Sequence, residues 1–124
     1  MDCIFCKIAN GELPSKTLYE DDVVMVIMDT NPIRDGHTLI IPKKHFTDFM
    51  ELDEDTTKHI FMIAKKMTNI LMEKLNTKSV TLLINYGDDQ KVKHYHLHLL
   101  PDFGATDVSL AKRSIEENYS LIMN

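Results

Sequence analysis

The chain has 124 residues, of which 44% are hydrophobic and 27% charged, and its formal net charge is −5. This length and composition are typical of one folded domain, so we expect a single domain over residues 1–124. The negative charge argues against nonspecific nucleic-acid binding, and no apolar stretch is long enough to cross a bilayer. The first residues lack the basic and long apolar regions of a signal peptide, so we expect a cytoplasmic protein.

The first third of the chain is expected to hold one short helix and three strands. Residues 2–10 are predicted to form a short helix, and Gly11 is a natural residue to end it. The apolar run at 23–28 is suited to a buried strand, because it is short and rich in Val, Ile and Met. Two further segments are predicted to form strands, at 16–20 and 37–42. Turns are expected at Asp21-Asp22 and in the loop at Asn31-Pro32.

The rest of the chain is expected to hold a long helix, two strands and a last helix. Asp53 is placed to cap the long helix, and the acidic residues after it complement the helix dipole. His59 in this helix is interpreted as a solvated residue. Apolar residues at three- and four-residue spacing form one core-facing stripe: Ile60, Ile63, Ala64, Met67, Ile70, Leu71 and Leu75. Strands are expected at 79–85 and 94–100, and a last helix at about 107–122, starting at Asp107 with Leu110, Ala111, Ile115, Tyr119 and Ile122 on one side.

Together these elements predict an α+β fold. Short connections between strands favour antiparallel pairs. The expected architecture is a five-stranded antiparallel sheet with one long helix packed on it and short helices near both ends. The chain contains only four glycines and lacks the glycine fingerprints of Walker-type and Rossmann-type nucleotide sites, which excludes those two classes.

Three of the six histidines stand at alternate positions of one short run, as His94, His96 and His98. On a strand, side chains at alternate positions point to the same face, so these imidazoles are expected to converge. Buried imidazoles each need a polar partner, so a purely structural row is difficult to satisfy. Imidazole near neutral pH acts as base, nucleophile or metal ligand, and the row therefore indicates a catalytic or a metal site.

Cys3 and Cys6 form a C-x-x-C pair with three interpretations. A disulfide is disfavoured in the cytosol, and a redox motif would follow a strand in a βαβ unit, which is not expected here. The third interpretation is half of a tetrahedral zinc site that two histidines would complete. The candidates for those histidines are His37, His45, His59 and one of the strand histidines, and the residues alone do not choose among them.

These blocks together resemble the histidine triad (HIT) family, most closely its Hint branch and the bacterial relatives. The run from His94 to Leu100 is similar to the family's motif of histidines alternating with apolar residues. The stretch from Met28 to His45, with Gly36-His37-Thr38-Leu39 in its centre, resembles a second family block. Residues Cys3 to Ile8 resemble the opening of zinc-binding members. The resemblance extends from residue 2 to about Asp102 and implies a homodimer with a continuous sheet.

The resemblance also implies a role for each site residue. His96 would be the nucleophile, His98 would contact the phosphate, and His37 would line the same site. Asp29 would accept hydrogen bonds from the ribose hydroxyls, and a turn-forming role is its alternative interpretation. The remaining nucleotide-binding residues would surround the base or belong to the phosphate-side loop: Phe5, Ile8, Ile27, Met28 and Leu39, and Asn85, Gln90 and Val92. Structural zinc would bind four residues, with no catalytic metal: Cys3, Cys6, His45 and His94.

The implied reaction is hydrolysis of a nucleoside 5′-phosphoramidate, of the adenylate-amine type, through a nucleotidyl-histidine intermediate. The implied partners are an AMP-type purine nucleotide and a second copy of the chain, with no nucleic acid and no membrane. Three alternatives stay open: a dinucleoside polyphosphate hydrolase, a nucleotide-binding protein with little catalysis, and a module in which the three strand histidines bind metal together.

The loop at 85–93 is where the chain departs from the family's pattern. It is two residues shorter than the usual family loop and lacks that loop's Ala-Gly step. Asp88 and Asp89 would repel a phosphate, whereas Lys91 would partly neutralise them or favour a more negative substrate. This departure is the main support for the binding-protein alternative.

Overall fold

An antiparallel sheet is the central element of the structure, a computed structural model that describes residues 3–105 and 111–124. The strands are β1 (Thr17–Glu20), β2 (Val24–Met28), β3 (Thr38–Pro42), β4 (Val80–Leu83) and β5 (Leu97–Pro101). Every hydrogen-bonded pair is antiparallel, and the spatial order is β1-β2-β3-β5-β4. The predicted five-stranded antiparallel sheet is therefore confirmed, with β5 inserted between β3 and β4.

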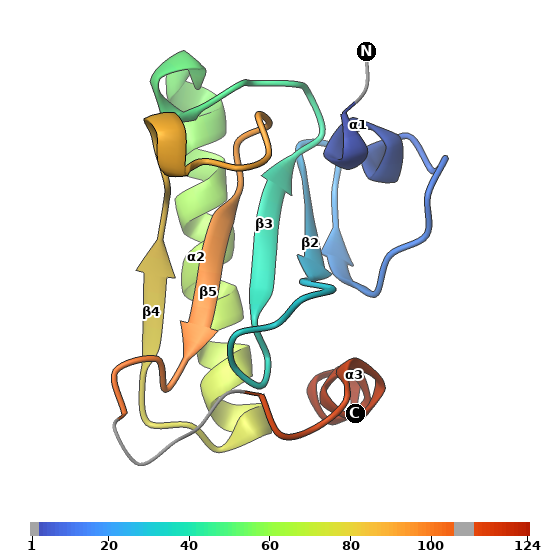
Figure 1. Ribbon diagram of the computed structural model, residues 1–124, viewed down its shortest axis with the longest axis vertical. Coiled ribbons are helices and arrows are strands. Elements are labelled where there is room, and N and C mark those ends of the chain that lie inside the picture. The colour runs from blue at the N-terminus through green and yellow to red at the C-terminus, as the bar shows by residue number, and fades with distance from the viewer. Residues whose placement is uncertain (1–2, 106–110) are drawn as a thin grey trace.

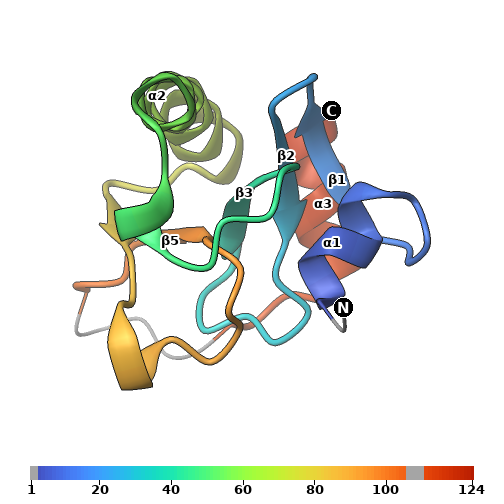
Figure 2. The same ribbon diagram turned by 90° about the horizontal axis from the view of Figure 1, so that it is seen from above.

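Helices cover the sheet on both sides. The long helix α2 (Glu54–Leu75) runs along one face, and the short helix α1 (Ile4–Ala9) lies on the opposite side (Figures 1 and 2). The last helix, α3 (Ile115–Met123), packs against α2 and the edge strand β1. Two short 3₁₀ turns, Phe49–Glu51 and Gly87–Asp89, precede α2 and β5. Within the described ranges, no helix combines the length and the apolar character needed to cross a membrane.

The two central strands β2 and β3 are buried along their whole length, because a helix covers each face. This explains why their sequences are continuously apolar, whereas strands of a sheet with one solvated face alternate apolar and polar residues. Alternate residues serve two separate cores. Val24, Val26, Met28 and Ile40 belong to the core that α2 covers, whereas four intervening apolar residues pack with α1: Met25, Ile27, Leu39 and Ile41.

The strand register brings one histidine into the α1-side row. Ile27 of β2 is paired with Leu39 of β3, and Leu39 is paired in turn with His98 of β5. Directly paired residues of an antiparallel sheet point to the same face. His98 therefore stands on the side of the sheet that α1 covers, while its neighbours Leu97 and Leu99 belong to the α2-side core.

The long helix begins where it was predicted. Asp53 is its N-cap, and the Asp53 carboxylate accepts a hydrogen bond of 2.7 Å from the Thr56 amide. Two expectations about this helix were wrong. Ile70 is 39% exposed and is not part of the buried stripe. His59 is not simply solvated, because its Nε2 lies 2.6 Å from the carboxylate of Asp21, which joins α2 to the β1–β2 turn.

Strand β5 and helix α3 are both shorter than predicted. The strand begins at Leu97, so His94 and His96 lie in the irregular segment before it. Residues 111–114 are not helical, and α3 starts only after Ser114, whose side chain forms a capping box with Glu117. The expected helix start at Asp107, with Leu110, lies outside the described residues.

Candidate functional site

A cavity of about 410 Å³ opens on the α1 side of the sheet. Its lining is largely apolar, and three of its polar side chains lie together: His37, His96 and His98. Most of the nucleotide-binding residues expected from the sequence line it: Phe5, Ile8, Ile27, Met28, Asp29, Leu39, Asn85 and Val92. An apolar pocket with a few convergent polar groups is the usual form of a small-molecule site.

The imidazole of His96 has a defined tautomer. Its Nδ1 lies 2.8 Å from the backbone carbonyl oxygen of His94, and a carbonyl only accepts hydrogen bonds. Nδ1 therefore carries the proton in the neutral ring, and Nε2 keeps its lone pair. Burial lowers the pKa of His96, outweighing the His94 hydrogen bond and the charge of Asp29, both of which raise it. The neutral form, with a nucleophilic nitrogen, is thus favoured at pH 7.

His37 and His98 form a hydrogen-bonded pair whose proton positions are also fixed. The Ile33 amide donates to Nδ1 of His37 at 3.1 Å, so His37 carries its proton on Nε2. That Nε2 lies 2.9 Å from Nδ1 of His98 and donates to it. His98 must then carry its own proton on Nε2, a buried atom that has no hydrogen-bond partner among the described residues. The result is an N–H donor without a partner in a side chain that lines the cavity.

Burial keeps this pair uncharged. It lowers the pKa of His98 to about 4, with further lowering by the nearby His96 and His37. The pKa of His37 is also lowered, again mainly by burial, against an opposing effect of Asp29. The Asp29 carboxylate lies 3.4 Å from Nε2 of His37, and its other oxygen accepts from the Asn31 amide at 2.8 Å. Asp29 is thus both a turn former and a lining residue, which joins its two sequence interpretations.

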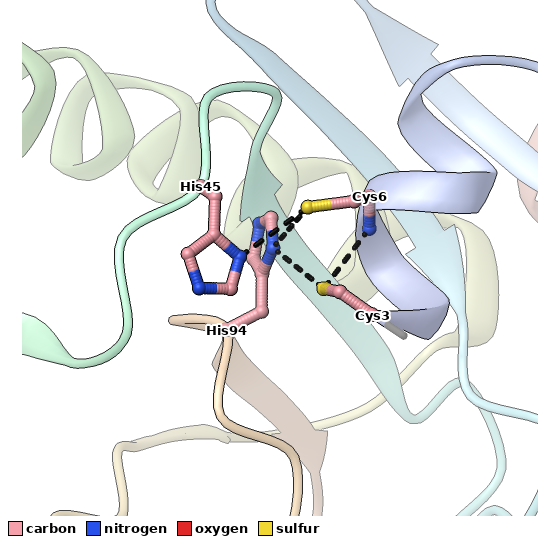
Figure 3. A group of neighbouring side chains, drawn as sticks. All are labelled: Cys3, Cys6, His45 and His94. Atoms are coloured by element: carbon pink, nitrogen blue, oxygen red, sulfur yellow. Dashed lines mark hydrogen bonds between the residues drawn. The ribbon is translucent and has the colours of Figure 1, made fainter. Parts of the chain in front are cut away.

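Four further side chains meet at the start of α1. Cys3, Cys6, His45 and His94 point toward one another (Figure 3) and offer ligand atoms that all lie within 4.8 Å of each other. The distance from Cys3 Sγ to His94 Nδ1 is 3.2 Å, and Cys6 Sγ lies 3.3 Å from His45 Nδ1 and 3.5 Å from His94 Nδ1. A tetrahedral zinc site with two sulfurs and two nitrogens has ligand–ligand edges of about 3.3–3.8 Å, so this group fits zinc.

Local structure explains why these four residues converge. Cys3 is the N-cap of α1, and its Sγ accepts from the Cys6 amide at 3.2 Å, which places both sulfurs at the start of one helix. The Tyr95 amide donates to the Phe46 carbonyl at 2.7 Å and holds the segment with His94 beside the one with His45. Nε2 of His94 lies 2.8 Å from the Pro42 carbonyl and carries the proton, so Nδ1 is free to face the sulfurs.

The alternation of histidines predicted one shared face, and the structure divides them. Because His94 precedes β5, its buried ring turns toward the cysteines, whereas His96 and His98 line the cavity. The row therefore does not form a single three-histidine metal site. Gln90 also differs from the expectation: it is 3% exposed and does not line the cavity. Its amide nitrogen donates to the carbonyls of Thr47 and Val92 and braces the loop from inside.

Several lining residues were not singled out as binding residues from the sequence. Lys91 and Asp89, from the shortened loop, stand at the cavity, as do Thr30, Asn31, Ile33 and Ile4. Thr30 and Asn31 follow Asp29 directly, so adjacency to a candidate ligand residue was a usable signal. Ile33 affects the site through its backbone amide, which donates to His37. The identity of the side chain at a position does not indicate such a backbone contact.

Comparisons with known proteins agree with this geometry. The HIT domain family matches residues 10–105. The chain belongs to the histidine triad family. A zinc-bound histidine triad protein from Mycobacterium smegmatis superposes with a TM-score of 0.89 and 31% identity, over 99% of this chain and 91% of that one. The HIT fold is therefore confirmed, and the cysteine–histidine cluster of this HIT protein fits the metal named in that structure.

Two other HIT relatives have names that describe a ligand or an activity. A histidine triad nucleotide-binding protein from Candida albicans is 37% identical, with a TM-score of 0.74 over 81% of this chain and 74% of that one. The adenylylsulfatase HINT3 of Arabidopsis thaliana is 38% identical over 81% of this chain and 52% of its own length. These names describe the two relatives, and what they share with this chain is the HIT family.

Proposed function

We propose that the chain hydrolyses nucleoside 5′-phosphoramidates of the adenylate-amine type, with His96 as nucleophile. The observation that carries this proposal is the hydrogen bond from His96 Nδ1 to the His94 carbonyl, which leaves the Nε2 lone pair of a neutral, cavity-lining imidazole. A positioned neutral imidazole with its second nitrogen engaged is the form that attacks phosphorus most readily.

The cavity suits a nucleoside monophosphate group. Its apolar part, formed by α1, β2 and β3, would enclose the base, with Phe5, Ile27 and Leu39 among the residues in contact. Asp29 would accept hydrogen bonds from the ribose hydroxyls, since both oxygens of its carboxylate are held by neighbours and the side chain is only partly buried. The phosphate would then lie at the histidine end.

The reaction proceeds by two displacements at phosphorus. The lone pair of His96 Nε2 forms a bond to the α-phosphorus while the P–N bond to the amine breaks, and the amine leaves with a proton taken from solvent. Water then attacks the nucleotidyl-histidine, loses a proton, and releases AMP and neutral His96. The unpartnered Nε2–H of His98 would donate to a phosphoryl oxygen as charge develops there.

The zinc proposed for Cys3, Cys6, His45 and His94 is structural. These residues hold α1 against the two segments that carry His45 and His94, and α1 in turn provides Phe5 and Ile8 to the cavity. With four protein ligands a zinc site is closed and leaves no position for substrate. Its contribution to the reaction would be a fixed cavity wall.

An adenylyl sulfate is a second candidate substrate, favoured by two observations. The Arabidopsis relative is named for this activity. Lys91 lines the cavity, and it also lines a neighbouring one of about 520 Å³ that has no carboxylate among its lining residues. A cation between the two spaces would favour an anionic leaving group such as sulfate.

The experiment that tests this function compares AMP release from three substrates: adenosine 5′-phosphoramidate, adenosine 5′-phosphosulfate and a diadenosine polyphosphate. We expect the wild-type protein to turn over the phosphoramidate, and His96→Ala to reduce kcat by about 10³-fold or more. His59→Gln, at a histidine outside the cavity, is the matched control and should retain activity. Preferred turnover of the polyphosphate would favour that alternative, and AMP binding without turnover would favour a binding protein.

A further inference from the structure

The turn that carries His37 is clamped by the C-terminal segment. This segment, residues 111–118, runs beside the loop that joins β2 to β3 and leads into α3 (Figure 1). The Ala111 amide donates to the Ile33 carbonyl at 3.2 Å. Asp35 Oδ1 accepts from the amides of Lys112 at 3.1 Å and Arg113 at 2.9 Å. The contacts reach from one end of the chain to the wall of the cavity.

The clamp is built mainly around one carboxylate. The side-chain amide of Asn118 donates to the same Asp35 oxygen at 3.1 Å, and Asn118 is only 1% exposed. Arg113 Nε in turn donates to the side-chain oxygen Oδ1 of Asn118 at 2.8 Å, which fixes the orientation of the Asn118 side-chain amide. Three donors on one oxygen, one of them a buried side chain, hold the turn more firmly than a single surface contact.

The clamped turn determines where the protons of the histidine pair lie. Within it, the His37 amide donates to the Arg34 carbonyl at 3.1 Å, and the Ile33 amide donates to Nδ1 of His37. The backbone of Ile33 thus accepts from Ala111 through its carbonyl oxygen and directs His37 through its amide nitrogen, in two consecutive peptide groups. If the Ile33 amide turned away, Nδ1 of His37 would lose the donor that forces its proton onto Nε2.

We propose that the 111–118 segment is a positioning element for the candidate site, acting through Asp35 and the backbone of Ile33 on His37 and, through His37, on the unpartnered N–H of His98. Asp35 is a positioning residue rather than a catalytic one, because it does not line the cavity. The inference rests on the proposed function only in what the His98 donor is used for. Which nitrogens of His37 and His98 carry the protons does not depend on any substrate.

The first test is nitrogen NMR of histidine-labelled, zinc-loaded protein near pH 7.5, with His98 assigned from a His98→Gln sample. We expect wild-type His98 to have a protonated Nε2 and an unprotonated Nδ1. In Asp35→Ala, we expect the His98 signals to move toward a mixture of both tautomers. Asp35→Asn keeps an acceptor oxygen for the amides of Lys112 and Arg113 and should restore much of the wild-type pattern.

The second test separates positioning from simple loss of stability. With adenosine 5′-phosphoramidate, Asp35→Ala should lower kcat by about 10- to 100-fold with little change in KM, because misplacement of a reacting group affects the chemical step. Glu116→Gln is the matched control, since it removes the 2.8 Å contact between Lys16 and Glu116 of α3 but leaves the clamp intact. It should change neither kcat nor the His98 signals.

The outcomes are distinguishable from failure of the proposed function. Unchanged His98 signals in a folded Asp35→Ala protein would overturn the positioning role, whatever the activity. If Asp35→Ala does not fold, Asn118→Ala, which removes one of the three donors, should give a smaller shift in the same direction, and no shift would overturn the proposal. Wild-type protein that releases no AMP would refute the phosphoramidate activity, while the NMR comparison would still decide the positioning role.

Discussion

Single hydrogen bonds to the backbone determine which nitrogen of each histidine in the site carries the proton. The His94 carbonyl accepts from Nδ1 of His96, and the Pro42 carbonyl accepts from Nε2 of His94. In His37 a donor, the Ile33 amide, fixes the proton on Nε2, and the hydrogen bond from that Nε2 to Nδ1 of His98 fixes the His98 proton on its Nε2 as well. His96 therefore has an unprotonated Nε2 and His98 a protonated Nε2, which is why the two can line one cavity in unlike roles.

The pH dependence of kcat/KM should reflect the lowered pKa of His96. Burial is the largest cause of the lowering, and as the proposed nucleophile His96 would react only when neutral. Because a lowered pKa keeps the ring neutral as the pH falls, activity should be retained below the ordinary histidine value of 6.5 and be lost only at lower pH.

A pH–rate profile with adenosine 5′-phosphoramidate measures this midpoint. Asp29→Asn should move it to still lower pH, because the charge of Asp29 raises the pKa of His96. An acid limb centred above 6.5 would contradict the assignment of His96 as a buried neutral nucleophile.

Gly36 occupies a position that no other residue fits without strain. Its φ is +83°, and a Cβ atom there would overlap Cδ1 of Leu75 at the end of α2. Gly36→Ala should lower the free energy of unfolding by about 2–4 kcal/mol, from the left-handed backbone and the overlap together. Gly11→Ala is the matched control, since Gly11 has φ +79° with open space around it and should lose only about 1–2 kcal/mol.

Urea denaturation of both variants measures the difference. Equal losses for Gly36→Ala and Gly11→Ala would mean that Leu75 moves aside and that the approach of the β2–β3 loop to α2 is not tight.

At the scale of elements, caps and turns connect helices and strands that are distant in sequence. Asp21 is the clearest case, because its carboxylate accepts from the amides of Val23 and Val24 in the turn, from the Tyr19 hydroxyl, and from His59 on α2. Burial alone would raise the pKa of Asp21, but these hydrogen bonds outweigh it and the pKa is lowered. One residue thus ties the β1–β2 hairpin to the long helix.

Asp21→Ala should therefore lower the free energy of unfolding by about 1–3 kcal/mol, because several donors lose their acceptor. Asp22→Ala, at the adjacent exposed carboxylate, is the control and should change it by less than about 0.5 kcal/mol. Since the folded pKa is lowered, the stabilisation by Asp21 is present above about pH 4 and is lost as the pH falls. A constant difference between wild type and Asp21→Ala from pH 7 to pH 2 would contradict this account.

Most of the elements could be predicted from the sequence, because periodic apolar residues and caps are local signals. The long helix has both, in Asp53 and the stripe from Ile60 to Leu75. The ends of β5 and α3 could not be predicted in the same way. The ring of His94 faces Cys3 and Cys6, which are 91 and 88 residues away in the chain, and the segment before α3 is held by hydrogen bonds to Asp35.

Among the candidate site residues, the side chains were easier to predict than the backbone groups. The alternating histidines and the C-x-x-C pair identified most of the residues that the structure gathers into two clusters. Three features depend on the fold as a whole: the division of the histidines between the clusters, the hydrogen bond from the Gln90 side chain to Thr47, and the one from the Ile33 amide to His37. They have no counterpart in local sequence patterns.

At the scale of the whole molecule, the cluster of Cys3, Cys6, His45 and His94 joins three segments: α1, the segment that carries His45, and the segment before β5. Removal of zinc with a strong chelator should lower Tm by roughly 10–20 °C, since a ligand held far above its Kd contributes about 4 kcal/mol. Burial and the neighbouring Cys3 raise the pKa of Cys6 to about 11, so zinc binding should also release protons.

Zinc content by elemental analysis and thermal melts check this expectation. Cys6→Ser should lose zinc and melt early, whereas His96→Ala should retain zinc at the wild-type ratio. A parallel loss of zinc in His96→Ala would instead support a metal site shared by the whole row of histidines.

The exposed apolar side of α2 and β4 is the surface on which we expect the homodimer to form. Phe61 and Leu82 are each 43% exposed, and they line a shallow cavity of about 300 Å³ beside the edge strand β4. Light scattering should give twice the mass of the chain, and Phe61→Glu should shift the protein toward monomer. Leu13→Glu, an equally apolar and exposed position outside that cavity, is the control. A wild-type mass of one chain would contradict the dimer.

His94 does two separable jobs, one with its ring and one with its main chain. The ring faces the cysteines, while the carbonyl accepts a hydrogen bond from Nδ1 of His96. Any residue at this position keeps the carbonyl, so a chain that lost the metal could still present a reactive His96, provided other packing held the segment in place. The first histidine of the row belongs to the scaffold through its side chain and to the chemistry through its peptide, and only the second of these is indifferent to mutation.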